Sequence, residues 1–313
     1  MSLLSLLFAL AAERSFSSDL WRFEHYYQLY TRFFQPDNAS SNASGTTLRY
    51  TIFLLFPMAL MYGILFFVGD GFLHFFISTL ILIVCFGCVT TRQHYKQFLH
   101  AASRDEQTTS ALYHQQLLQN KNLPPMGFGQ ALIWLNYRYY IAIMLFFIIF
   151  GAVGVVFYRL VTTILEQQSG VAPVSSDKET KNENQEEAEQ VYNKEQNTID
   201  IDSCFNSPSN STGCKNYRRI LFYLDWLPVR VTSFGYMFVG HFSKAFPTWL
   251  ESFFDVKKPT HKILIDVAQQ SEDIMVDKDD CTAEPCLLVR LSKRNILLLL
   301  ATIASLTLFG VIA

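Results

Sequence analysis

Long apolar blocks alternate with polar and charged stretches along the chain, and their lengths predict membrane helices. Residues 51–68 and 72–90 are two such blocks separated by three residues, so we expect a tight helical hairpin with Asp70 at its tip. A further block at 141–161 follows a belt of Trp, Tyr and Arg and has two glycines in its middle. These glycines favour either close helix contact or a re-entrant turn in place of a full crossing.

Three other apolar blocks are less regular. Residues 3–12 are short for a span, 220–239 contain charged residues and a proline, and 296–313 are long enough to cross a bilayer with little tilt. A helix ending near Phe34 mixes aromatic and charged side chains, which is typical of the headgroup level. We therefore predict an all-α, polytopic membrane protein with about five spans plus interfacial helices.

Changes in composition divide the chain into five regions. Residues 166–217 are acidic and poor in bulky apolar groups, so we expect a disordered linker there. The predicted regions are an N-terminal membrane region with the hairpin and a cytoplasmic loop (1–165), the linker (166–217), a motif-bearing helical region (218–255), a soluble tail (256–294) and a C-terminal span (295–313). Lys and Arg gather beside the hairpin and before the last block, which places those faces in the cytoplasm.

The overall composition supports this class of protein. Half of the residues are hydrophobic and only 17% are charged, against about 25% in a typical soluble domain. We therefore expect the lipid bilayer as a partner. The net charge of −2, together with the lack of a basic stripe with interleaved aromatics, argues against binding to nucleic acid.

The sequence Leu-Asp-Trp-Leu-Pro-Val-Arg at 224–230 places ionisable residues inside an apolar block. An Asp or Arg at the centre of a membrane helix costs about 2.5–3.5 kcal/mol on insertion scales, so such residues usually face each other, a bundle interior or a wet cavity. Asp225 and Arg230 therefore form either a structural ion pair or part of a ligand or partner site. Pro228 removes a backbone donor, so we expect a broken or interfacial element here.

Polar residues predicted to face the cytoplasm form the best candidate for a functional site, a cleft built from 94–138 and 225–244. We expect Asp225 to orient Arg230 and the arginines to hold an anionic small molecule or a group of a cytoplasmic protein partner, because guanidinium groups bind phosphate and carboxylate in a bidentate manner. The candidate ligand-binding residues are Arg104, Asp105, Asn136, Arg138, Asp225 and Arg230. For Arg104, Asn136 and Arg138 a helix cap or an interface anchor is the structural alternative.

One part of this set has a purely structural explanation. The run Ser103-Arg104-Asp105-Glu106 fits a capping box, with Ser103 as the N-cap and Glu106 at the third helical position. We therefore expect a helix to begin there, which accounts for Ser103 without any ligand.

Cysteine and glycine patterns give little evidence of metal or cofactor chemistry. Cys204 and Cys214 bracket a short polar loop and are well spaced for a disulfide if that loop lies outside the cytoplasm. No Cys and His residues have zinc-ligand spacing, and the glycine-rich phosphate-binding motifs are absent. We expect no metal and no cofactor.

Five motifs together resemble the AmpE family, inner-membrane proteins linked to the regulation of β-lactamase induction in Gram-negative bacteria. They are Glu13-Arg14, His100-Ala-Ala-Ser103-Arg104-Asp105, Trp134-Leu-Asn136-Tyr-Arg138-Tyr-Tyr140, the 224–230 sequence and Gly240-His241-Phe-Ser-Lys244-Ala-Phe-Pro247-Thr-Trp249. They run in family order from the N-terminus to about residue 255. The resemblance covers roughly two thirds of the chain, because 166–215 and 256–290 match little. The resemblance implies a multi-pass protein of the bacterial inner (plasma) membrane, with a regulatory or sensory role in β-lactamase induction and peptidoglycan-recycling stress.

The family is similar in turn to the cobinamide-phosphate synthase of cobalamin biosynthesis. That enzyme has a Ser-Arg-Asp motif and an Asp…Pro-Ala-Arg motif, comparable to 103–105 and 225–230 here. Its Asn-Thr-Leu-Asp-Ser-Met stretch corresponds to 162–166, which keep little of it. We therefore expect a regulator without enzymatic activity. A membrane-embedded ligase or transferase acting on an anionic substrate, and an interaction scaffold, are the alternatives.

Overall fold

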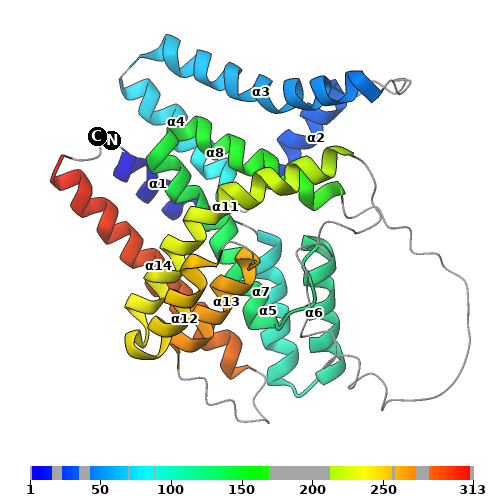
Figure 1. The fold of residues 1–313 in the computed structure, drawn as a ribbon, viewed down its shortest axis with the longest axis vertical. Helices are drawn as coiled ribbons and strands as arrows, with labels where there is room; N and C mark the ends of the chain where they lie inside the picture. The colour runs from blue at the N-terminus through cyan, green and yellow to red at the C-terminus, as the bar shows by residue number, and fades with distance from the viewer. Residues whose placement is uncertain are drawn as a thin grey trace, which may run out of the picture.

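The computed structural model describes residues 2–15, 23–34, 43–69, 71–87, 89–168, 212–255, 258–272 and 282–310, and these residues form helices and no strands. The all-α prediction is confirmed, as is the helix that ends at Phe34. The elements are α1 (Ser2–Ser15), α2 (Phe23–Phe34), α3 (Ala43–Val68), α4 (Phe72–Cys85), α5 (Val89–Ser103), α6 (Gln107–Lys121), α7 (Phe128–Asn136), the π-helix η2 (Tyr137–Ile141), α8 (Ala142–Gln168), α11 (Thr212–Val239), α12 (Phe242–Phe254), α13 (Thr260–Ser271) and α14 (Ala283–Leu308). Figure 1 shows α8 and α11 at the centre of the bundle, with α3 along the top edge and the α5–α6 pair at the lower right.

The first two long apolar blocks form the predicted helical hairpin of α3 and α4. The connection between them is residues 69–71, and Gly69 has a φ of 65°, a conformation that glycine adopts readily. Asp70, the predicted tip, lies outside the described residues. The two helices and the short connection confirm the hairpin.

The second arm of this hairpin is shorter than predicted. Helix α4 ends at Cys85, and the polar helix α5 begins at Val89 instead of the apolar block continuing to residue 90. Gly87 lies in the break with a φ of 78°, and its N–H donates to the carbonyl of Tyr139 at 3.3 Å. This glycine lets the chain bend before the apolar block is complete.

Helix α8 turns back on itself at Gly151. This residue has φ 66° and ψ −160°, a conformation that is essentially restricted to glycine. The ring centroids of Phe146 and Tyr158 are 4.7 Å apart, whereas a straight helix would separate these residues by about 18 Å. Near the open end, Tyr139 donates a hydrogen bond of 2.9 Å to Glu166. The block at 141–161 is therefore a re-entrant hairpin, one of the two arrangements that its glycines favoured.

Helix α11 continues through Pro228, so the predicted break at this residue is wrong. Pro228 is buried, and its carbonyl accepts a hydrogen bond of 2.7 Å from Thr232 Oγ1. Helices α8, α12, α13 and α14 all pack against α11. Packing on several sides keeps the helix continuous although proline removes one helical hydrogen bond.

The C-terminal helices belong to the same body. Helix α13 packs on α7, α11 and α12, and α14 packs on α7 and α11. Asn295 on α14 donates to the carbonyl of Thr232 at 3.1 Å, which joins α14 to α11 by a buried polar contact. The predicted boundary between tail and final span, at 294, falls inside α14.

Helices α5 and α6 form a polar hairpin, and the capping-box prediction for their connection is wrong. Ser103 is the last residue of α5, where its Oγ donates to the carbonyl of His100 at 3.0 Å. Glu106 is the N-cap of α6, and Asp105 has a φ of 58°. The backbone N–H of Glu106 bonds to the carbonyl of Ala101, so the run closes the end of α5 instead of opening α6.

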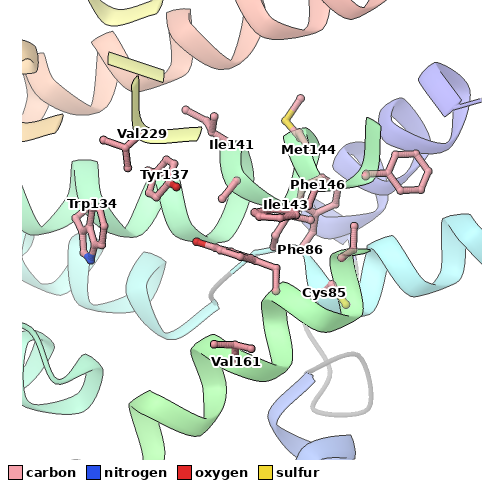
Figure 2. Close-up of a cluster of buried hydrophobic side chains, with 14 of the residues drawn as sticks. Cys85, Phe86, Trp134, Tyr137, Ile141, Ile143, Met144, Phe146, Val161 and Val229 are labelled. Carbon is pink, nitrogen blue, oxygen red and sulfur yellow. The ribbon is translucent and has the colours of Figure 1, made fainter. Parts of the chain in front are cut away.

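The main hydrophobic core lies where the α8 hairpin meets α4, α7 and α11. Figure 2 shows its centre, which includes Cys85, Phe86, Trp134, Tyr137, Ile141, Ile143, Met144, Phe146, Val161 and Val229. Among the described residues, Thr51–Val68 and Phe128–Glu166 are long and apolar enough to cross a membrane, and the bent pair Phe72–Cys85 and Thr90–Ser103 is a third candidate. The count of about five spans stays a prediction.

Candidate functional site

The candidate site lies at the open end of the α8 hairpin. Here the π-helix η2, at the start of the outgoing arm, is brought beside Glu166, near the end of the returning arm. π-Helical turns are rare and often occur at functional sites. Because Gly151 folds the two arms together, residues 27 positions apart, Tyr139 and Glu166, come into direct contact.

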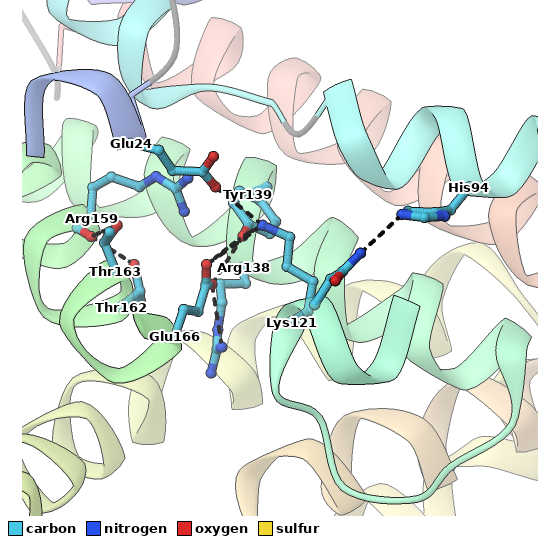
Figure 3. Close-up of polar contacts among 10 residues, drawn as sticks. Glu24, His94, Lys121, Arg138, Tyr139, Arg159, Thr162, Thr163 and Glu166 are labelled. Carbon is cyan, nitrogen blue, oxygen red and sulfur yellow. Dashed lines mark hydrogen bonds and ion pairs between the residues drawn. The ribbon is translucent and has the colours of Figure 1, made fainter. Parts of the chain in front are cut away.

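A buried cluster of charges surrounds Glu166, which we call the Glu166 cluster (Lys121, Arg138, Tyr139, Arg159 and Glu166; Figure 3). The Tyr139 hydroxyl donates to both carboxylate oxygens of Glu166 at 2.9 Å, and Lys121 Nζ lies 3.6 Å from Oε2. The side chains of Lys121 and Glu166 are only 5% and 8% exposed. Lys121 also donates to the Tyr139 hydroxyl at 2.7 Å, so this part of the cluster is well bonded.

Two cations of the cluster lie over the Tyr139 ring. The Arg159 guanidinium is 4.3 Å from the ring centroid and Lys121 Nζ is 4.9 Å from it. Lys121 further contacts Glu24 on α2 at 3.4 Å, at the edge of the cluster where the Glu24 side chain is 35% exposed. The cluster thus ties α2, α6, η2 and α8 together by charge.

Asp225 belongs to a second buried network. Its Oδ1 accepts hydrogen bonds from the hydroxyls of Tyr137 at 2.7 Å and Tyr158 at 2.9 Å, and the Asp225 side chain is 1% exposed. Tyr137 belongs to η2 and Tyr158 to the returning arm of α8. Asp225 therefore joins α11 to both arms of the hairpin.

Arg138, on η2, is the member of the Glu166 cluster that makes no hydrogen bond to any described residue. Its NH1 is 3.7 Å from Glu166 Oε1, beyond hydrogen-bonding distance, and its side chain is 12% exposed. Its Nε is buried and has no partner among the described residues. Trp134 supports the guanidinium, whose Cζ is 5.1 Å from the indole centroid. Buried donors are nearly always satisfied, so this group requires an explanation.

Two neighbouring residues shape the surroundings of Arg138. The Oδ1 of Asn136 is also buried and unpaired within the described chain, but residues two apart on a helix point to different sides, so Asn136 does not complete the same site. His261 on α13 lies edge-on to Trp134, with ring centroids 6.0 Å apart. Burial, with the nearby charges of Lys262 and Arg138, lowers the pKa of His261 to about 4, so the ring is neutral at physiological pH.

Arg230 is not the partner of Asp225, and this part of the prediction is wrong. Its Nε donates to the carbonyl of Phe253 at 3.0 Å, and its NH2 donates to the carbonyls of Asp255 at 2.9 Å and Ser252 at 3.5 Å. NH1 donates to the carbonyl of Trp226, whose ring the guanidinium covers. Arg230 therefore caps the C-terminus of α12, where a cation is favourable. Residues five apart on a helix point in different directions, which explains why the pair does not form.

The remaining predicted residues lie apart from the cluster. Arg104 and Asp105 are exposed in the α5–α6 turn, at the opposite end of α6 from Lys121. The predicted disulfide between Cys204 and Cys214 lies outside the described residues. Within the described chain, no three His, Cys, Asp or Glu residues are grouped so that they could hold a metal ion.

The sequence prediction missed the residues that surround Arg138. Lys121 ends a polar helix and was not considered, and Glu166, at the end of an apolar block, was assigned to the disordered linker at 166–217. Tyr137 and Tyr139, which bind Asp225 and Glu166, were interpreted as part of an interface belt. One signal was available in the sequence. If the apolar block at 141–161 folds back on itself, the Glu166 carboxylate after its end must lie close to the residues just before its beginning.

Comparison with known proteins gives the family. The AmpE family, described as "Regulatory signalling modulator protein AmpE", matches residues 1–186 and 206–313. The chain belongs to the AmpE family. It is 25% identical to "Protein AmpE" of Shigella flexneri over 321 residues, which cover 99% of both chains. No solved structure matches the chain. The AmpE relationship and the apolar helices assign a regulatory role to a membrane protein, and the link to cobinamide-phosphate synthase remains a resemblance.

Proposed function

We propose that this AmpE-family protein is a multi-pass regulator in the bacterial inner membrane that senses peptidoglycan-recycling stress and modulates β-lactamase induction. It does so by binding an anionic small molecule at Arg138. The family assignment supports the regulatory part of this proposal. The chemistry of Arg138 supports the ligand class.

The observation that carries the proposal is the guanidinium of Arg138, which makes no hydrogen bond to the described residues and whose ion pair with Glu166 is long, at 3.7 Å. A guanidinium has five N–H donors in a planar fork that matches carboxylate and phosphate. Arg138 Nε is buried without a partner among the described residues, although leaving a buried charged donor unpaired costs more than the 1–3 kcal/mol typical of a neutral group. An anionic ligand that accepts hydrogen bonds from Nε and NH2 would remove this cost.

Glu166 gives the site a means of signalling. Its carboxylate lies 3.7 Å from Arg138 NH1, and Tyr139 and Lys121 hold it there. A ligand anion beside Arg138 would lie near this carboxylate, and like charges repel each other. Glu166 and the returning arm of α8 would then move away from η2, which is the change that reports binding. Glu166→Gln removes this repulsion and is expected to keep binding while losing the response.

The test is complementation of a deletion strain by wild-type protein, Arg138→Ala and Arg138→Lys, with induced β-lactamase activity as the readout. The control is Arg290→Ala, because Arg290 is an exposed arginine on α14. We expect wild-type protein and Arg290→Ala to restore the wild-type response and Arg138→Ala to fail at equal membrane abundance. A wild-type response from Arg138→Ala would refute the ligand site, and co-purification of a soluble protein that survives this substitution would favour a scaffold.

A further inference from the structure

The outer face of α11 is entirely apolar over the length of the 220–239 block. Between these residues, each position that is more than about a third exposed carries an apolar or aromatic side chain. These positions are Tyr223, Leu227, Val231, Phe234 and Phe238. Their spacing of three or four residues places them in one stripe along the helix.

The inner face of the same helix carries its polar residues. Asp225 and Arg230 are 1% and 2% exposed, and Thr232 and Ser233 are also buried. A helix of a water-soluble protein has the opposite arrangement, with apolar residues inward and charged residues outward. Polar side chains directed into the bundle and apolar ones directed outward are the arrangement expected in lipid.

The apolar stripe continues onto α12. Phe234 on α11 contacts Trp249 on α12, with ring centroids 5.5 Å apart. Phe242, Phe246, Leu250 and Phe254 are exposed at four-residue intervals along α12. Lys244 and Glu251, which are also exposed, point to the other side of this helix. Helix α12 thus has an apolar face, a charged face and a buried face, the arrangement of a helix lying at a membrane interface.

The same apolar exterior occurs on separate elements. Helix α3 is long and apolar enough to span a membrane, and only 6% of its apolar segment Thr51–Val68 is buried. A small part of α3 packs on α11. Exposed apolar residues also occur on α1, α4 and α14, for example Phe8, Phe76 and Leu297. A protein partner or a second copy covers one patch, whereas an apolar exterior distributed over so many helices requires an apolar solvent.

We propose that the outer face of α11 is embedded in the acyl chains of the lipid bilayer and that α12 lies beside it at the headgroup level. Asp225 is then at membrane depth, held inside the protein by Tyr137 and Tyr158. This inference does not depend on the proposed ligand. The mean hydropathy of α11 does not reveal its contact with lipid. The polar residues of the inner face lower the average over the helix and so hide the apolar stripe.

The test is site-directed spin labelling in nanodiscs of phosphatidylethanolamine and phosphatidylglycerol. Single nitroxides are placed at Phe238→Cys and Phe246→Cys, with Lys244→Cys as the matched control on the charged face of α12. The background replaces the reactive native cysteines with serine and must keep wild-type thermal stability. Collision with oxygen reports lipid, and collision with a water-soluble nickel chelate reports water.

We expect labels at 238 and 246 to be several-fold more accessible to oxygen than to nickel, and the label at 244 to show the reverse preference. High access to both reagents at 238 would place α11 in water and overturn the proposal. Low access to both would show that a protein surface, including a second copy of this chain, covers the stripe, and would overturn it equally. Leu227→Cys provides a second position on the stripe if Phe238→Cys does not fold.

Discussion

Arg138 and Arg230 are both largely buried arginines that lie against a tryptophan ring, and the sequence proposes both for the same site. Their hydrogen bonds separate them. Arg230 donates to four backbone carbonyls, three of them at the end of α12. Arg138 makes no hydrogen bond to any described residue and lies 3.7 Å from one carboxylate oxygen.

This difference teaches that burial and charge alone do not identify a functional residue. A cation whose donors are all used inside the protein has no capacity left for a ligand, and its contribution is to stability. A buried cation with unused donors is costly in the free protein and gains most when an anion arrives. The predictions below test whether the two arginines divide in this way.

The largest effect is expected from Arg230→Ala. The substitution leaves carbonyls at the C-terminus of α12 without their donor and removes the cation that covers Trp226, so we expect a loss of about 3 kcal/mol or more in the free energy of unfolding. Thermal unfolding of the detergent-purified protein measures this loss. If Arg230→Ala instead kept the wild-type melting temperature but lost the regulatory response, Arg230 would have a functional role and not a structural one.

A smaller loss is expected from Gly151→Ala, which tests how Arg138 and Glu166 are brought together. The backbone at Gly151 is in a region that alanine rarely adopts, so we expect a loss of about 2 kcal/mol and a weaker response in cells. The matched control is Gly63→Ala in the interior of α3, where an added Cβ meets nothing within 4 Å. This control is expected to be neutral or slightly stabilising. Equal stability of both variants would contradict the re-entrant hairpin.

The pH dependence of stability tests the surroundings of Arg138 through His261. Its pKa is lowered from 6.5 to about 4 in the folded protein, so the unfolded chain binds more protons between these values. The contribution of His261 to the free energy of unfolding is therefore complete above pH 6.5. It is lost as the pH falls toward 4, by up to about 1.4 kcal/mol per pH unit. Comparison of melting temperatures of wild type and His261→Gln at pH 7.5 and 5.5 isolates this contribution, and parallel shifts in both proteins would contradict it.

The smallest effect on stability is expected from Arg138→Ala. Arg138 makes no hydrogen bond to the described residues, and without it Glu166 keeps its ion pair with Lys121 and its hydrogen bond from Tyr139. We therefore expect a change within about 1 kcal/mol in the free energy of unfolding without ligand, in contrast to Arg230→Ala. Chemical unfolding of both variants in the same detergent gives the comparison. A loss from Arg138→Ala as large as that from Arg230→Ala would mean that the two arginines do not differ.

Much of the architecture follows from local patterns in the sequence. The apolar blocks predict the α3–α4 hairpin, and Gly151 with Gly154 predicts the turn inside α8 as one of two arrangements. The break expected at Pro228 does not occur because α11 packs against four other helices, and the local sequence does not show which neighbours a helix will have. The capping box fails at Ser103 for a related reason, since the same residue types that begin a helix also end one.

The site was less predictable than the fold. Ligand binding by Arg138, Asn136 and Asp225 stays a prediction, and the partners that the structure gives Arg138 and Asp225 come from distant segments. Lys121, Tyr139 and Glu166 meet only because α8 folds back, and the sequence left that fold open. Arg230 was assigned to Asp225 because they are close in sequence, whereas three of its four acceptors lie 22 to 25 residues away at the end of α12.

The central claim is that Arg138 binds an anion that Arg230 does not. Mass spectrometry of small molecules retained by the detergent-purified protein tests it most directly, with wild type, Arg138→Ala and Arg290→Ala prepared in parallel. We predict a phosphate- or carboxylate-bearing molecule retained by wild type and Arg290→Ala and at least about tenfold depleted in Arg138→Ala, since one charged hydrogen bond is worth about 1.5–3 kcal/mol. Equal retention by all three proteins, or none in any of them, would contradict the claim.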